Sequence, residues 1–214
     1  MVTSREYPLN GPLIDDEELF ADLKEAVHWC KPIKKDPNAQ MKEKKEKKDD
    51  KAEPKAGPKV SGRLILDLPH VLQVVHLRHK LTGKSLLVAN THLYWHPRGN
   101  NVRTIQAAVC LRLIARELKQ LDDHSAGVIF AGDFNSGAHS AAVRHCLGET
   151  IPDSDIDFYS SGSAGHYKLK EPLMPPITLS SAISPTPGET KNQKTKNKKH
   201  FQFIVIMWRR SRVC

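Results

Sequence analysis

Residues 84–97 read KSLLVANTHLYWHP and residues 127–136 read GVIFAGDFNS, and these two stretches decide the fold. Each opens with a short apolar run and closes with a polar loop. Apolar runs this short, bounded by turn-forming residues, are typical of buried strands. We therefore predict two strands of one sheet, at 84–91 and 127–131, whose C-terminal ends carry the polar loops.

A further strand precedes these two. Residues 70–78 read HVLQVVHLR and are separated from residues 84–91 by a polar turn that contains Gly83, which predicts a β-hairpin. Residues 86–89 read LLVA and lack apolar and polar alternation. This pattern favours a central strand covered on both faces.

Helices are predicted on either side of the strand at 127–131. Residues 102–121 carry an apolar stripe at helical spacing, typical of a helix packed on a sheet, formed by Val102, Ile105, Val109, Cys110, Leu113, Ile114, Leu118 and Leu121. Ser140 can cap a second helix that runs through Leu147 and ends at Gly148. The order strand, strand, helix, strand, helix predicts an α/β protein with helices covering a sheet.

The chain divides into four segments by composition: a helical segment at 1–30, a Lys-rich loop at 31–61, the α/β region at 62–162 and a basic tail at 163–214. The loop has no periodic apolar face, and we expect it to be disordered. The tail is expected to be disordered as well. Within it, the apolar run FQFIVIMW at 201–208 could be a strand but has no visible partner.

The positive charge belongs to the low-complexity segments. The net charge is +9, yet residues 31–59 contribute 11 Lys against 6 acids, and residues 191–212 contribute 8 Lys or Arg with no acid. The remainder of the chain is net negative. Charge runs of this kind are usually solvated segments, so a basic nucleic-acid-binding tail protein is the weakest of the functional hypotheses.

Cysteine usage and hydropathy exclude two classes of protein. The four cysteines have no CxxC pairing and no metal-ligand spacing, which favours reduced, buried thiols over a disulfide scaffold. Apolar runs are far shorter than a membrane span. We expect neither a secreted scaffold nor a membrane protein.

The polar loops after the strands carry the candidate chemistry. Asp133 and Asn135 follow a turn at Gly132 and project to the same side, so they could bind a hard cation or hold an attacking water. Alone, this segment is equally typical of an Asx-type loop. His92 alone is more often a structural residue, but it ends a buried strand as Asp133 does.

The two strand ends should therefore meet. We predict that His92 and Asp133 lie at one edge of the sheet, close enough to contact one phosphate, with the helix at 102–121 packed across the face between the strands. Asn135 should face the same cavity. Phe134 should point inward and pack.

The sequence NTHLYWHP, followed by a helix with Arg103 and Gln106 and then by VIFAGDFNS, resembles the endonuclease/exonuclease/phosphatase superfamily. Within it the motifs look most like the deadenylase branch, and there like its 2′,5′-phosphodiesterases. The resemblance covers residues 68–162. It implies a two-sheet α/β sandwich with outer helices, of which this chain holds a part.

The resemblance also implies roles for particular residues. Asp133 would activate water and help to hold Mg²⁺, Asn135 would position the nucleophile or the phosphate and act as a second metal ligand, and His92 would donate to the scissile phosphate. Substrate contacts would come from Asn90, Trp95 and His96. The substrate would be RNA or oligoadenylate, with neither DNA nor a membrane as partner.

Two parts of the family pattern are not found in this sequence. The family places a metal-binding Glu upstream of these strands, and residues 1–67 do not offer it. The family also places a Ser-Asp-His motif downstream, and it does not occur after Gly162. We expect a fragment of the family domain, an alternative transcript or a mispredicted gene model, with weak activity or none. The alternative is a catalytically dead binding module. The resemblance implies the mitochondrial matrix, but without a transit sequence in this chain, and the cytoplasm is the alternative.

Overall fold

The structure is a computed structural model that describes residues 2–11, 15–28, 65, 68–97, 99–121, 123, 125–159, 169–181 and 206–208. Its elements follow the order β1 (Val2–Pro8), α2 (Glu17–His28), β2 (Val71–Arg78), β3 (Ser85–His92), α5 (Asn100–Gln120), β4 (Gly127–Asp133), α6 (Ala141–Cys146), α7 (Ile156–Tyr159), β5 (Ser180–Ser181) and β6 (Ile206–Trp208). The predicted α/β class is confirmed.

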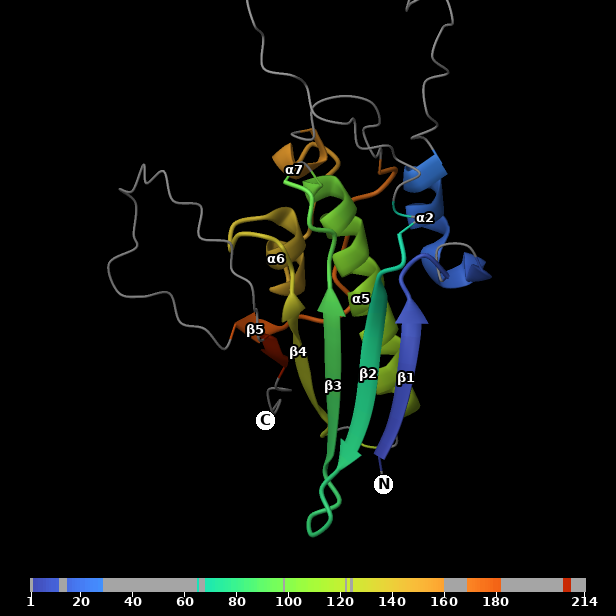
Figure 1. Ribbon diagram of the computed structural model, residues 1–214, viewed down its shortest axis with the longest axis vertical. Helices are drawn as coiled ribbons and strands as arrows, with labels where there is room; N and C mark the ends of the chain where they lie inside the picture. The colour runs from blue at the N-terminus through green and yellow to red at the C-terminus, as the bar shows by residue number, and fades with distance from the viewer. Residues whose placement is uncertain are drawn as a thin grey trace, which may run out of the picture.

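The described strands form one mixed sheet in the order β1-β2-β3-β4-β6-β5. The pair β3 and β4 is parallel, whereas β2 pairs antiparallel with both β1 and β3. Figure 1 shows β1 to β4 standing side by side with α5 running behind them. The predicted hairpin is β2–β3, and the helix at 102–121 is α5, which makes the crossover between the two parallel strands.

The two faces of the sheet differ in burial. On β3, Leu87 and Ala89 are fully buried on the side of α5, while Leu86 and Val88 point to the other side and are half-buried. Successive side chains of a strand point to opposite faces, so the alternation identifies the covered face. The prediction that residues 86–89 are covered on both faces is wrong for the described part of the chain, where helices cover one face.

α5 is buried on most of its circumference because it packs against the sheet and against three other helices, α2, α6 and α7. Its apolar stripe faces the core, with Val102, Ile105, Val109, Cys110, Leu113 and Ile114 all buried. On another side, the guanidinium of Arg112 donates to both carboxylate oxygens of Asp22 in α2, at 2.7 Å each. The thiols of Cys110 and Cys146 are free and buried, as predicted.

α6 confirms the capping pattern read from the sequence. The Ser140 side chain accepts a hydrogen bond from the Val143 amide, and the chain leaves the helix through Gly148 at a φ of +99°. A Cβ at Gly148 would lie 2.5 Å from the Thr178 methyl group. Glycine is therefore required both by the left-handed backbone and by the close approach of residue 178.

The ends of the chain hold elements beyond those predicted. Residues 2–8 form an edge strand inside the segment expected to be helical, and α2 follows it. In the predicted disordered tail, Leu169, Leu173 and Leu179 are buried, and β6 pairs with both β4 and β5. The predicted Lys-rich loop at 31–61 lies outside the described residues.

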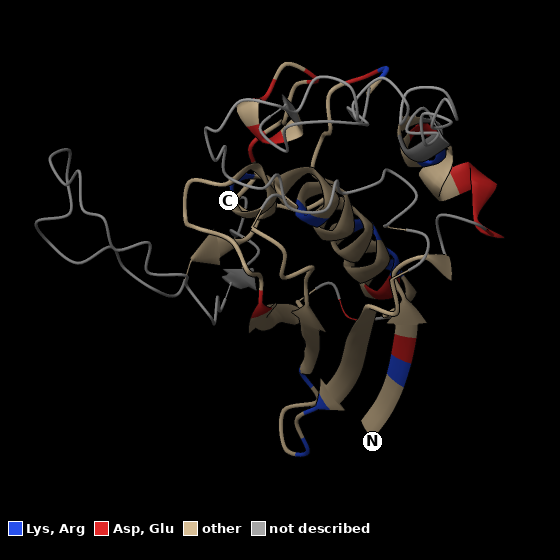
Figure 2. Cartoon of the chain, turned by 45° about the horizontal axis from the view of Figure 1, so that its top comes forward, with Lys and Arg blue, Asp and Glu red and all other residues tan. Residues whose placement is uncertain are grey.

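Charge within the described part is mixed. Acidic residues outnumber basic ones there, with acids gathered at the start of α2 and Lys and Arg at the tip of the β2–β3 hairpin (Figure 2). In the same part of the chain, every helix is too short or too polar to cross a membrane.

Candidate active site

The parallel pair β3 and β4 brings His92 and Asp133 together. The two residues are direct partners in the register of the strands, and His92 Nε2 lies 3.8 Å from Asp133 Oδ2. Their neighbours Thr91 and Gly132 are buried, so the pair projects to the face opposite α5. The His92 side chain is 69% exposed and that of Asp133 26%. The predicted meeting of the two strand ends is observed.

Gly132 makes the close approach of the two strands possible. Its φ is +143°, and a Cβ built there would lie 1.8 Å from the carbonyl oxygen of Thr91. Any side chain would force the strands apart at the point where Asp133 faces His92. The glycine thus sets the position of the carboxylate as well as the turn.

The loop after β4 is fixed by its own backbone and by Asn135. The backbone N–H of Asn135 donates to Asp133 Oδ1 at 2.9 Å, with Asn135 in the left-handed region at a φ of 47°. The Asn135 side chain donates to the carbonyl of Leu93 at 2.9 Å, which ties the loop after β4 to the loop after β3. Phe134 points inward and is fully buried, with its ring 5.0 Å from that of Phe130.

The loop after β3 forms an aromatic shelf beside the His92–Asp133 pair. The ring of Tyr94 is buried and stacks on His96, with ring centres 6.1 Å apart and planes at 15°. Trp95 lies next to both rings and is 66% exposed. Asn90, two residues before His92, is exposed on the same face of the sheet. The loop that follows His92 therefore presents one exposed indole, that of Trp95, which is tilted against the buried Tyr94 ring and the His96 ring.

His70 is a neighbour that the sequence did not single out. Its half-buried ring meets Tyr94 edge-on at 6.1 Å, and its Nδ1 is buried without a partner in the described part of the chain. Burial lowers the pKa of His70, and the nearby His92 lowers it further. As the first residue of a predicted strand, His70 carried no local signal of this position.

The described donors fall short of a complete magnesium site. Magnesium needs nearly octahedral oxygen ligation, and Asp133 with Asn135 offers one carboxylate and one amide. Within the described ranges, His, Cys, Asp and Glu side chains form no cluster of three that could hold a metal ion. The Asp133 carboxylate is partly exposed, with Oδ2 toward His92, so it could serve as one ligand.

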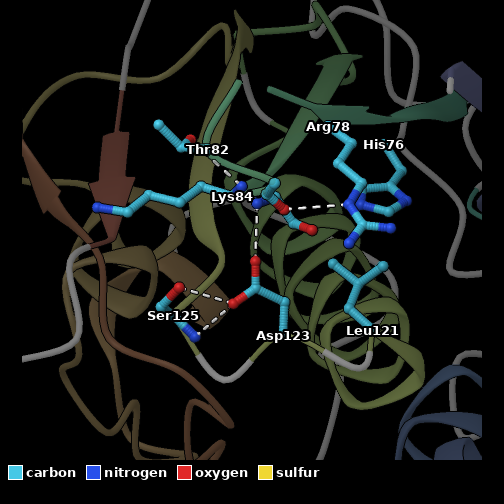
Figure 3. Close-up of a pocket in the computed structure, with 9 residues that line it drawn as sticks. His76, Arg78, Thr82, Lys84, Leu121, Asp123 and Ser125 are labelled. Carbon is cyan, nitrogen blue, oxygen red and sulfur yellow. Dashed lines mark hydrogen bonds between the residues drawn. The ribbon is translucent and has the colours of Figure 1, made fainter. Parts of the chain in front are cut away.

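A cavity of about 380 Å³ lies at the other end of the sheet, remote from these residues. Figure 3 shows it between the hairpin and the loop that precedes β4. Asp123 forms its floor and accepts hydrogen bonds from the Ser85 amide and from Ser125. The Arg78 guanidinium is held by the Gly83 carbonyl, and Lys84 extends away from it. None of the predicted site residues line this cavity.

Comparison with known proteins confirms the resemblance seen in the sequence. No family model matches the chain. Human 2′,5′-phosphodiesterase 12 is 40% identical over 99 residues, which is 46% of this chain and 16% of that protein. RNA exonuclease NGL1 of Saccharomyces cerevisiae is 33% identical over 89 residues, covering 39% of this chain and 24% of the relative. The match thus spans less than a quarter of the length of each relative.

The fold is shared with solved structures of the same branch. ANGEL2, described as a 2′,3′-cyclic phosphatase and solved in complex with adenosine-2′,3′-vanadate, superposes with a TM-score of 0.51 at 20% identity. The superposition covers 67% of this chain and 51% of ANGEL2. The chain resembles the deadenylase branch of the endonuclease/exonuclease/phosphatase superfamily, and its relatives there are named a phosphodiesterase and an exonuclease, both of which are classes of hydrolase.

Proposed function

We propose that this chain forms part of the active site of a phosphodiesterase that hydrolyses RNA-type linkages. The observation that supports the proposal is the in-register pair of His92 and Asp133, 3.8 Å apart at an accessible edge of the sheet. A proton acceptor and a proton donor at this separation can act on one phosphate. The curated relatives, named a phosphodiesterase and an exonuclease, support the same class of reaction.

Each side chain has a distinct part in the proposed reaction. Asp133 accepts a proton from the attacking water, whose oxygen then bonds to phosphorus as the bond to the leaving oxygen breaks, and the leaving oxygen keeps the electron pair and takes a proton from solvent. His92 donates a hydrogen bond to a phosphoryl oxygen, where negative charge grows in the transition state. Asn135 keeps the Asp133 carboxylate in place through its backbone N–H, and its side chain can orient the water or the phosphate.

The proposed substrates are 2′,5′-linked oligoadenylate and the 3′ ends of RNA such as poly(A). The exposed indole of Trp95 can stack on a base, with His96 next to it, and Asn90 offers an exposed amide on the face of β3 that carries His92. Magnesium dependence is part of the proposal, with Asp133 and Asn135 as the ligands that this part of the chain supplies. The ion would neutralise charge on the phosphate when bound.

A second candidate is a binding module that holds nucleotides without cleaving them. The small number of possible metal ligands among the described residues favours this alternative. It retains the aromatic shelf and the His92–Asp133 pair as a wall for a phosphate. The two candidates differ in whether binding is followed by turnover that depends on Asp133.

The test is hydrolysis of 2′,5′-linked and 3′,5′-linked triadenylate by the purified chain 1–214, with and without Mg²⁺. We expect slow turnover that falls by about 10²-fold in Asp133→Asn, because proton transfer to a positioned base typically contributes that much. His92→Gln should cost about 10²-fold as well, because it removes a donor to the developing charge.

Glu6→Gln is the matched control for Asp133→Asn. Glu6 is an exposed carboxylate on β1 that accepts a hydrogen bond from Gln73 at 2.8 Å, away from the site. Its removal should leave turnover within about twofold. Binding of triadenylate without Asp133-dependent turnover would support the binding module, and absence of both binding and turnover would refute both candidates.

A further inference from the structure

Arg103 holds the loop that carries the aromatic shelf. It lies in the first turn of α5 and is only 3% exposed. Its Nη1 donates to the carbonyl oxygens of Tyr94 at 3.0 Å and His96 at 2.7 Å, and its Nη2 donates to the Asn100 side chain. One guanidinium therefore binds the backbone on both sides of Trp95.

Two further side chains hold the same loop. Gln106, one turn further along α5, accepts a hydrogen bond from the Tyr94 amide at 2.9 Å. Asn135 donates to the Leu93 carbonyl. The loop is thus tied to α5 and to the Asp133 loop at successive backbone groups, whereas the indole of Trp95 remains largely exposed.

Holding this loop buries the positive charge of the Arg103 guanidinium, which a surface loop does not ordinarily require. In the described part of the chain, Arg103 makes no direct ion pair with a carboxylate. Its nearest link to one runs through Asn100, which donates to Asp157 at 2.7 Å. Burial lowers the pKa of Arg103, which the Asp157 charge opposes. Burying a guanidinium is costly, and the Arg103 Nε is buried without a partner in the described part of the chain, so the bonds that Nη1 and Nη2 make to the loop and to Asn100 must offset that cost.

We propose that Arg103 is a positioning residue that preorganises Trp95 as a stacking platform for a substrate base. This inference rests on the function proposed above. Arginine suits the task because its planar fork reaches three oxygen acceptors at once, which the single ammonium of lysine does not. A platform that is already ordered loses little side-chain and loop entropy on binding, so the stacking contact contributes fully to affinity.

The proposal makes base recognition the quantity to measure. The affinity of the full chain 1–214 for triadenylate is compared with its affinity for the same oligonucleotide with one abasic position. Stacking on an aromatic side chain should favour the intact oligonucleotide by about tenfold or more. Arg103→Lys should reduce this preference by about fivefold and leave the affinity for the abasic oligonucleotide within about twofold.

Arg112→Lys is the matched control. Arg112 lies on the same helix and also binds a backbone carbonyl, that of Leu19 at 2.7 Å, together with the Asp22 carboxylate. It contacts α2 and not the shelf. Both lysine variants lose a multidentate guanidinium, so a general loss of stability affects both, whereas loss of the base preference should occur in Arg103→Lys alone.

Two further measurements separate positioning from mere structural support. In a Trp95→Leu background, Arg103→Lys should change the base preference no further, because the arginine acts through the indole. Hydrogen exchange of the Tyr94 amide should quicken about tenfold in Arg103→Lys, while the Val88 amide in the centre of β3 keeps its protection. Arg103→Gln serves the same comparison if the lysine variant fails to fold.

Each outcome is decisive. If Arg103→Lys keeps both the base preference and the Tyr94 protection, the positioning role is refuted. If the unaltered chain binds neither oligonucleotide, the proposed function fails, and a quickened Tyr94 exchange still establishes Arg103 as the residue that orders the loop. An unaltered chain that binds both oligonucleotides equally refutes the stacking platform alone.

Discussion

Gly132 shows how one residue fixes the geometry of the candidate site. Because a Cβ there would lie 1.8 Å from the Thr91 carbonyl and the φ of +143° is unfavourable for other residues, Gly132→Ala must both separate β3 from β4 and strain the backbone. We expect a loss of about 2–4 kcal/mol in the free energy of unfolding. Urea denaturation measures it.

Gly137→Ala is the control for that experiment. Gly137 lies in the same loop, and a Cβ built there would meet nothing within 4 Å. Its substitution should change the free energy of unfolding by less than about 0.5 kcal/mol. Equal stability of the two alanine variants would show that the strands can yield at residue 132, and that the glycine does not fix the position of Asp133.

At the residue scale, the sequence predicted the groups that end strands and missed those that act through tertiary contacts. His92, Asp133 and Phe134 were found because a strand end followed by a polar loop is a local pattern. The clamping contacts of Arg103 were not predicted, because its three acceptors come together only when the loop folds back onto α5. His70 was missed because its contact with Tyr94 and its nearness to His92 also arise only in the folded chain.

At the scale of elements, Asp123 joins the start of β3 to the loop before β4. It accepts hydrogen bonds from the Ser125 hydroxyl at 2.6 Å, the Ser85 amide at 2.7 Å and the Ser125 amide at 2.9 Å. These bonds hold the pKa of Asp123 well below its usual range. Because the folded-state pKa is lower than the unfolded one, this stabilisation is present above the usual carboxyl pKa and is lost as the pH falls through and below it.

We therefore expect Asp123→Ala to lower the urea midpoint at pH 7 and to speed hydrogen exchange at the Ser85 amide. The midpoint difference between the variant and the unaltered chain should shrink at low pH, as the carboxylate of the unaltered chain is protonated. Ser125→Ala removes only the strongest of the three bonds, and its effect should be smaller. A midpoint difference that is independent of pH would contradict the part given to the carboxylate.

Elements with a strong local period were predictable, and those that exist through distant pairing were not. The hairpin, α5 and β4 have turn signals or an apolar stripe of their own. β1 reads VTSREYP, in which only Tyr7 is partly buried and the other side chains are exposed, so its strand character comes from pairing with β2. The run at 201–208 had no visible partner because β4 and β5, to which residues 206–208 pair, lie far away in the sequence.

At the scale of the whole molecule, the candidate site belongs to the sheet face that the described helices leave open. α2, α5 and α6 all pack on one side, and this packing makes the strands rigid supports for the side chains on the other. His92 and Asp133 therefore combine exposure with a fixed backbone. That combination suits a site that must hold a phosphate at a defined position while the supporting backbone stays fixed.

The packing of α6 onto α5 makes the stability of the whole chain sensitive to mild acid. His145 is 1% exposed, and burial lowers its pKa to about 4. In the unfolded chain the pKa of a histidine is about 6.5, so between these values the unfolded state binds a proton that the folded state does not. The contribution of His145 is therefore intact above pH 6.5 and is lost as the pH falls toward 4.

We predict that His145→Gln flattens this pH dependence. For the unaltered chain, the free energy of unfolding from urea titrations should fall by about 2 kcal/mol more between pH 7 and pH 5 than it does for the variant. Burial also lowers the pKa of His70, and that contribution remains in both proteins and cancels in the comparison. His79→Gln, an exposed histidine of the hairpin turn, should keep the full slope. Equal slopes in His145→Gln and the unaltered chain would mean that the histidine gains its proton without unfolding, and that α6 can open locally while the sheet and the His92–Asp133 edge remain folded.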